Sequence, residues 1–321
     1  MIKKVYNKVT VSGNVLELLK TDEGILYGLN TSRKNWDTKR CEDMPRFDRM
    51  MKDISNFDRS IKRTKQTLIR SINSNYGRWS KNKYDNKFMT LTFKGEVTDY
   101  EFANKEFTRF IERLNYKVYR KKCAKLKYTA VIEHHNTEEN QGIHFHVIFY
   151  NLPYILHSEL LEIWRGKRGT GGVNIKSLDG VDNVGVYVTK YVEKEIEELS
   201  TIVKKVDDKF KFIDTFTEDK KNELMEELEK DFSNVVKNKH KKIYQQSRGL
   251  YKPIENSLND YESTKLIDYL REHSDAIEVC DNYYEDERMG NVNYIQFKLK
   301  PSSFLHMDKL LVDIVNVEDT C

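Results

Sequence analysis

Hydrophobic and polar positions in the middle of the chain follow the periods of strands and helices in turn. Alternation over Lys87–Phe93 predicts a strand, and helical spacing of apolar residues after Thr98 or Asp99 predicts a capped helix. The remaining predicted elements are the strands Tyr128–Glu133, Ile143–Tyr150 and Gly172–Lys176 and the helices Ser158–Trp164 and Val184–Glu197. The predicted fold class is α+β, with a central antiparallel sheet in ferredoxin-like β-α-β-β-α-β order and a following tyrosine-bearing helix.

Three regions are expected along the chain: an N-terminal accessory region (1–57), a central domain with the predicted sheet (58–200) and a C-terminal helical and mixed accessory region (201–321). Short apolar segments separated by glycines predict small strands or turns in the first region. The third region holds a charged helical pattern after Thr217 and a predicted strand over Val292–Leu299. The sequence therefore predicts one sheet domain with an extension on each side.

Composition excludes several classes of protein. The 321 residues contain no apolar run of transmembrane length and no secretory signal, so a soluble, intracellular protein is expected. The four cysteines lie far apart and form no C-x-x-C pair, which indicates neither a disulfide framework nor a thiolate zinc site. Hydrophobic residues make up 38% of the chain and charged residues 33%, so the surface is strongly ionised.

The net charge of +4 averages over segments of very different charge. Arg59–Tyr84 contains eight lysines and arginines and no acidic residue, and its apolar spacing suits a helix with cationic faces. Two further basic runs are Lys117–Lys127 and Lys237–Arg248. Each run is either a solvated charged surface or a surface that binds phosphates.

Candidate metal ligands lie on two neighbouring predicted strands. His144 and His146 are two residues apart, so both imidazoles leave the same face of their strand. If that strand pairs with the preceding one as a hairpin, Glu133 can add a carboxylate on the same face, and the three side chains can hold Mg²⁺ or Mn²⁺. His134 and His135 are alternative ligands, and a strand whose histidines are only hydrogen-bonded is the alternative to a metal site.

Candidate nucleophiles lie on the following helix. Tyr187 and Tyr191 are four residues apart and project from one helix face, and Lys190 and Lys194 follow each tyrosine at the same spacing. A packed aromatic pair is the simpler interpretation. A phenol attacks phosphorus at neutral pH only where a metal and cations support the reaction, and the candidate metal site and the lysines would supply both.

Together these segments resemble a known superfamily. Phe88–Phe93 resembles motif 1 of the rolling-circle replication initiators, His144-Phe145-His146 resembles their His-hydrophobic-His motif, and Tyr187–Lys194 resembles their tyrosine motif. These proteins are the HUH endonucleases. The doubled tyrosine is most similar to the Rep proteins of bacterial plasmids and single-stranded DNA phages. The resemblance covers about a third of the chain.

The resemblance implies an enzyme that nicks and rejoins one DNA strand at a replication origin. A divalent metal, Mg²⁺ or Mn²⁺, would be held by His144, His146 and Glu133, and a tyrosine would form a 5′-phosphotyrosine. The expected partners are single-stranded or hairpin origin DNA and a host helicase, in a bacterial cytoplasm. No phosphate-binding loop motif is present, so no nucleotide cofactor is expected.

With this activity in view, the basic segments and a glycine-rich basic loop are predicted to bind DNA. The predicted DNA-binding residues are Arg59, Lys62, Arg63, Lys65, Lys121, Lys122, Arg165, Lys167 and Arg168. Two alternatives remain: a single-strand transposase or relaxase of the same superfamily, and a non-catalytic DNA-binding regulator that contains a metal.

Overall fold

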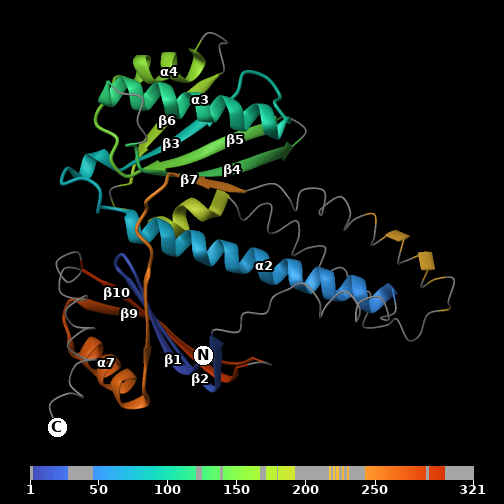
Figure 1. Cartoon of the computed structure of the whole chain (residues 1–321), viewed down its shortest axis with the longest axis vertical. Helices are drawn as coiled ribbons and strands as arrows, with labels where there is room; N and C mark the ends of the chain where they lie inside the picture. The colour runs from blue at the N-terminus through green and yellow to red at the C-terminus, as the bar shows by residue number, and fades with distance from the viewer. Residues whose placement is uncertain are drawn as a thin grey trace. The chain divides into compact units, whose positions relative to one another are not determined.

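The computed structural model describes residues 3–27, 46–120, 125–137, 140–166, 171–178, 180–191, 243–286 and 289–300, together with a few positions between 217 and 230. The chain separates into two compact units (Figure 1). One unit consists of residues 1–33, 73–75 and 251–321, and the other of residues 34–72 and 76–250. Each unit is built on one antiparallel five-stranded sheet, which confirms the α+β class and the central antiparallel sheet.

The sheet of residues 76–250 contains five strands. In spatial order they are β6 (Gly172–Ser177), β3 (Lys87–Thr92), β5 (Asn140–Phe149), β4 (Tyr128–Thr137) and β7 (Tyr244–Gln246). A short 3₁₀ helix, η1 (Lys83–Asp85), precedes β3. Helix α3 (Tyr100–Tyr119) connects β3 to β4, and α4 (His157–Arg165) connects β5 to β6. Along the chain the elements therefore follow one another as β3-α3-β4-β5-α4-β6.

One face of this sheet is covered by α3 and α4 (Figure 1). Its core is formed by alternate strand residues, such as Phe145 and Val147, packed against apolar residues of the two helices, such as Phe107 and Leu114. Asp99 caps α3 by accepting hydrogen bonds from the backbone of the first turn, as the sequence predicts. This buried face holds the strands in register and leaves the other face for a second layer.

The opposite face packs against α2 (Arg46–Asn75) and against a helix whose described part is residues 184–191. Leu68 and Ile72 of α2 are buried here with Phe88 of β3 and Val188 of the second helix. The basic pattern that begins at Arg59 does lie on a helix, and that helix starts well before it. The candidate metal ligands and tyrosines belong to this side of the sheet.

The other unit joins the two ends of the chain. Its strands, in spatial order, are β8 (Ile254–Leu258), β1 (Lys3–Ser12), β2 (Val15–Tyr27), β10 (Gly290–Leu299) and β9 (Ala276–Asp286). Helix α7 (Asp260–Glu272) packs on this sheet around a core that includes Leu16, Leu18, Leu266 and Phe297. The sequence analysis treats the two terminal regions as separate, whereas strands from both pair within one sheet.

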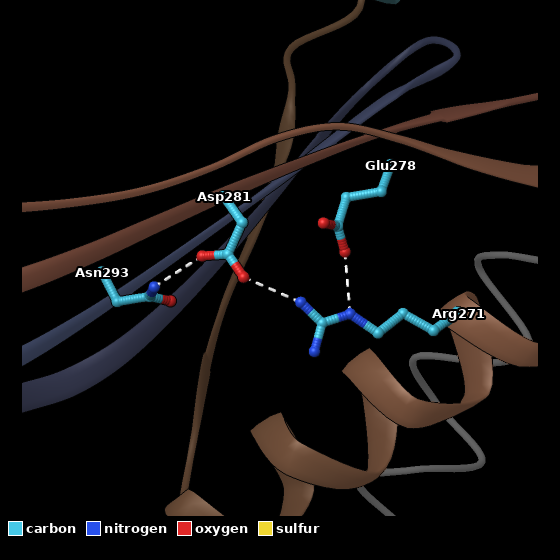
Figure 2. A network of polar contacts seen from close by, with 4 residues as sticks. All are labelled: Arg271, Glu278, Asp281 and Asn293. Atoms are coloured by element: carbon cyan, nitrogen blue, oxygen red, sulfur yellow. Dashed lines mark hydrogen bonds and ion pairs between the residues drawn. The ribbon is translucent and has the colours of Figure 1, made fainter.

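A polar network fastens α7 to the edge of that sheet (Figure 2). Arg271 of α7 donates to Glu278 and to Asp281 of β9, each at 2.8 Å. Asn293 of β10 donates to the second oxygen of Asp281 at 2.7 Å. Hydrogen bonding to the two carboxylates raises the pKa of Arg271 above its ordinary value, so its charge is secure. The network is partly exposed and therefore contributes to orientation more than to stability.

Most predicted elements of the central region are confirmed, with strands β4 and β5 longer than expected because they pair almost to the tip of their hairpin. The predicted strand Val292–Leu299 lies within β10. The elements β7, β8, α7 and β9 were not predicted. The predicted helix beyond residue 191 lies outside the described residues. Among the helices that the structure describes, none has the length and apolar character needed to cross a membrane.

Candidate active site

Pairing of three strands brings the candidate metal ligands together. In the β4–β5 hairpin Glu133 lies directly opposite His144, and Val131 lies opposite His146. On the other side of β5, Thr90 of β3 lies opposite His146. Directly paired residues project from the same face of a sheet. Glu133, both histidines and Thr90 therefore share the face covered by the helix of residues 184–191.

Glu133 and His146 form a buried pair. Their side chains are joined by a hydrogen bond of 2.6 Å between Nε2 of His146 and Oε2 of Glu133, and each residue is only 4% exposed. The other ring nitrogen of His146, Nδ1, lies 3.2 Å from the hydroxyl of Thr90. A buried carboxylate needs such partners because desolvation is costly, so this contact fixes both side chains in place.

The third candidate ligand, His144, is half-buried on the same face. Among the described side chains no group of three histidines, cysteines or acidic residues is arranged as a metal-binding cluster. The side chains of the alternative ligands His134 and His135 lie outside the described residues. The structure thus brings Glu133 and His146 into direct contact and places His144 opposite Glu133 on the neighbouring strand.

Both candidate nucleophiles lie beside this pair. The ring of Tyr191 stacks on His146 with centroids 3.7 Å apart and 17° between the ring planes. Tyr187 meets Tyr191 edge-on, at 6.3 Å and 82°. Phe88 contacts all three rings, stacking on His146 and Tyr191 and meeting Tyr187 edge-on. The expected aromatic pair is therefore packed, and it is packed against a candidate ligand.

The environment makes the Tyr191 phenol a weak acid. Partial burial, a hydrogen bond with Tyr187 and the nearby negative charges of Tyr187 and Glu133 raise the pKa of Tyr191 to about 12. The phenol is consequently neutral at physiological pH. A reaction at this oxygen requires an acceptor for its proton or a cation that stabilises the phenolate.

The predicted cations are only partly placed. Lys190 is exposed on the tyrosine helix, whereas Lys194 lies outside the described residues. The α2 residues Lys62 and Arg63 are exposed, Lys65 is half-buried, and Arg59 bonds to Ser55 and Asn56 of its own helix. Arg165 donates to the carbonyl of Gly171. The remaining predicted DNA-binding residues, Lys121, Lys122, Lys167 and Arg168, lie outside the described residues.

Phe88 and Thr90 are site residues to which the sequence analysis assigns no role. Both occupy alternate positions of β3, so the period of two places them on the same face as each other. That signal shows which residues share a face, but only the pairing of β3 with β5 places Thr90 against His146.

Comparison with known families bears on the same part of the chain. Residues 86–196 match the family model of the replication-associated protein ORF2. This is a family of rolling-circle replication initiators, and the match supports a Rep-type protein. The matched segment runs from the start of β3 past the two tyrosines, so it contains every residue of the candidate site. No curated protein and no solved structure matches the chain.

Proposed function

We propose that this protein is a rolling-circle DNA replication initiator that cuts one strand at the origin by tyrosine transesterification and later rejoins the ends. The proposal rests above all on the stacking of Tyr191 on His146, which is hydrogen-bonded to Glu133. A nucleophile thereby lies next to a histidine–carboxylate pair within the segment that matches replication-associated proteins. The substrate would be single-stranded or hairpin origin DNA.

The residues of the site fit a divalent cation. Two imidazoles and one carboxylate on one sheet face form a donor set for Mg²⁺ or Mn²⁺ that leaves positions for phosphate oxygens. The ligands would be His144, His146 and Glu133, and the bond between Glu133 and His146 would give way to the cation. When bound, the cation would supply charge stabilisation at the scissile phosphate. Thr90 would hold the ring of His146 through Nδ1.

In the cleavage step the phenol oxygen of one tyrosine forms a bond to phosphorus as the bond from phosphorus to the 3′-oxygen breaks. The tyrosine then carries a 5′-phosphate ester, and the phenol proton ends on the 3′-hydroxyl of the leaving strand. Because the ester conserves the energy of the phosphodiester, rejoining needs no nucleotide cofactor. A second tyrosine allows a second cleavage while the first remains linked.

The surrounding residues position these groups. Phe88 contacts His146 and both tyrosines and so fixes the distance between the nucleophiles and the histidine. Lys190 follows Tyr187 on the same helix and is exposed, so it can approach a phosphate beside the phenols. The basic residues of α2 would bind the DNA backbone, and a host helicase would separate the strands.

Covalent trapping tests this function directly. The full chain is incubated with Mn²⁺ and labelled single-stranded oligonucleotides that span candidate origins, and denaturing electrophoresis detects protein linked to DNA. We expect an adduct with the wild type and none when Tyr187 and Tyr191 are both replaced by phenylalanine. Phenylalanine keeps the rings that pack on Phe88 and removes only the hydroxyl groups, so the double variant should remain folded.

Two controls separate this function from its alternatives. Tyr150→Phe removes a buried hydroxyl bonded to Thr129, away from the proposed reaction, and should still form the adduct. DNA binding without any adduct, across all candidate origins, would contradict the enzyme and favour a non-catalytic DNA-binding regulator. An adduct unaffected by His144→Ala and His146→Ala would contradict the proposed ligands.

A further inference from the structure

A shallow hollow lies at the edge of the sheet that carries the candidate site. Its volume is about 460 Å³, and its walls come from the β5–α4 connection, the start of α4 and strand β6. The lining residues are Tyr154, Ile155, His157, Val173, Asn174 and Ile175. Tyr154 is 80% exposed, so most of its ring is available to another flat group.

The hollow continues the face that carries the candidate site. Asn174 of β6 lies opposite Thr90 of β3, and Thr90 lies opposite His146 of β5. These three side chains therefore form one row across the sheet. Neighbouring strands are about 4.8 Å apart, which separates Asn174 from His146 by roughly 10 Å along the row. A strand of DNA that crosses the candidate site can reach the hollow without leaving this face.

The polar groups of the hollow suit the edge of a nucleobase. His157 donates from Nε2 to the carbonyl of Val173 at 2.9 Å, so this carbonyl points away from β3. Backbone groups of a strand alternate in direction, and the N–H and C=O of Ile175 therefore point to the same outer side. In the order of described strands, β6 has β3 as its only neighbour. The hollow thus offers a backbone donor and acceptor beside the amide of Asn174.

The charges favour a base rather than a phosphate in the hollow itself. None of the six lining residues is a lysine, an arginine or an acid. A cation lies further along the strand at Lys176, which is exposed and shares the face of Asn174 two residues on. A nucleotide with its base against Tyr154 can therefore place its backbone toward Lys176.

We propose that this hollow binds one unpaired base of the single-stranded DNA substrate, which stacks on Tyr154 while Lys176 contacts the adjoining phosphate. The inference rests on the proposed function and deepens it, because it assigns a second contact point that sets where the strand lies over the tyrosines. Stacking on an aromatic ring tolerates any base, whereas the backbone and Asn174 can add a preference among bases.

Binding of a fluorescent oligothymidylate to the full chain, followed by anisotropy without metal, tests the stacking contact. Tyr154→Ala should weaken binding about tenfold, which corresponds to the loss of one stacked base. Tyr154→Phe keeps the ring and should bind like the wild type. The matched control is Tyr116→Ala on α3, where a tyrosine is 54% exposed on the helix that covers the opposite face.

Salt dependence tests the phosphate contact. Lys176→Gln should reduce the slope of log affinity against log salt by about 0.7, the value for one phosphate on a single strand. Lys105→Gln, an exposed lysine of α3, should leave the slope unchanged. In parallel, an oligothymidylate that carries 5-iododeoxyuridine is photocrosslinked, and mass spectrometry should locate the crosslink at Tyr154.

The outcomes distinguish the inference from the proposed function. If the wild type binds and forms the covalent adduct while Tyr154→Ala binds equally well and crosslinks lie elsewhere, only the hollow is wrong. If Tyr154→Ala and Tyr116→Ala weaken binding equally, the effect is general and the hollow is again wrong. If the wild type binds no single-stranded DNA, both proposals fail.

Discussion

Tyr191 stacks on His146 at a centroid distance of 3.7 Å, which places a candidate nucleophile in van der Waals contact with a candidate ligand. Tyr187 instead meets Tyr191 edge-on, with the two centroids 6.3 Å apart. The two tyrosines are therefore not equivalent in the structure, although the sequence spaces them symmetrically with their lysines. This asymmetry bears directly on the order in which the two phenols react.

The first prediction concerns which phenol reacts more readily. Tyr191→Phe should slow formation of the first covalent adduct more than Tyr187→Phe, because Tyr191 lies against His146 and Tyr187 lies one ring further away. Single-turnover assays with a labelled origin oligonucleotide measure the two rates. Both single variants should retain partial cleavage. A larger loss with Tyr187→Phe would mean that the contact with His146 does not mark the first nucleophile.

The second prediction concerns the metal and is read without enzymatic activity. Adding Mn²⁺ should raise the melting temperature of the wild type, since a ligand at a hundred times its dissociation constant stabilises the native state by about 2.7 kcal/mol. Glu133→Gln should abolish this increase because a neutral amide is a poor ligand. Glu106→Gln, which alters another buried carboxylate on α3, is the control and should keep the increase. Equal increases in both variants would remove Glu133 from the ligand set.

The third prediction concerns Gly171, which precedes β6. Its φ of +125° is unfavourable for other residues, and a Cβ added there would overlap the carbonyl oxygen of Thr92 at the end of β3. Gly171→Ala should therefore lower the free energy of unfolding by more than about 2 kcal/mol. Gly180→Ala is the control, because its φ is also positive but a Cβ there meets no atom within 4 Å. Denaturant titration compares the two, and similar losses would show that the overlap is relieved.

The fourth prediction concerns the buried end of α4. Trp164 is fully buried, packs on Phe93 and Phe110, and donates from its indole nitrogen to the carbonyl of Thr92 at 2.9 Å. Trp164→Phe leaves that carbonyl without its donor and opens a cavity, so the free energy of unfolding should fall by about 2–3 kcal/mol in denaturant titration. Trp79→Phe keeps a ring for Lys127 in a half-buried position and should cost less than about 1 kcal/mol. Equal costs would argue against the role of the buried hydrogen bond.

Local patterns were sufficient for much of the central region. The alternation of residues around Phe145 identifies which side chains are buried and that His144 and His146 share the opposite face, because strand period is a local property. Asp99 is identified as a helix cap for the same reason, since its hydrogen bonds reach only two and three residues ahead. The i, i+4 spacing likewise places Tyr187 and Tyr191 on one face of a helix.

Patterns that depend on distant pairing were missed. Nothing local indicates that β1 lies between β2 and β8, which are separated by more than two hundred residues, so the two ends of the chain were predicted as separate regions. The short strand β7 lies at the end of a basic run that hides its apolar content. Such strands are specified by the partner they pair with more than by their own residues.

The sequence by itself determined the class of fold, the order of elements around the tyrosines and the residue types from which a site can be built. Only the tertiary structure decided that Glu133 bonds to His146 instead of merely facing His144, that Thr90 supports the same ring, and that Phe88 contacts both the histidine and the tyrosines. The physical reason is that periodicity fixes the face on which a side chain lies, whereas the contact it makes depends on strand register and on the helix packed above.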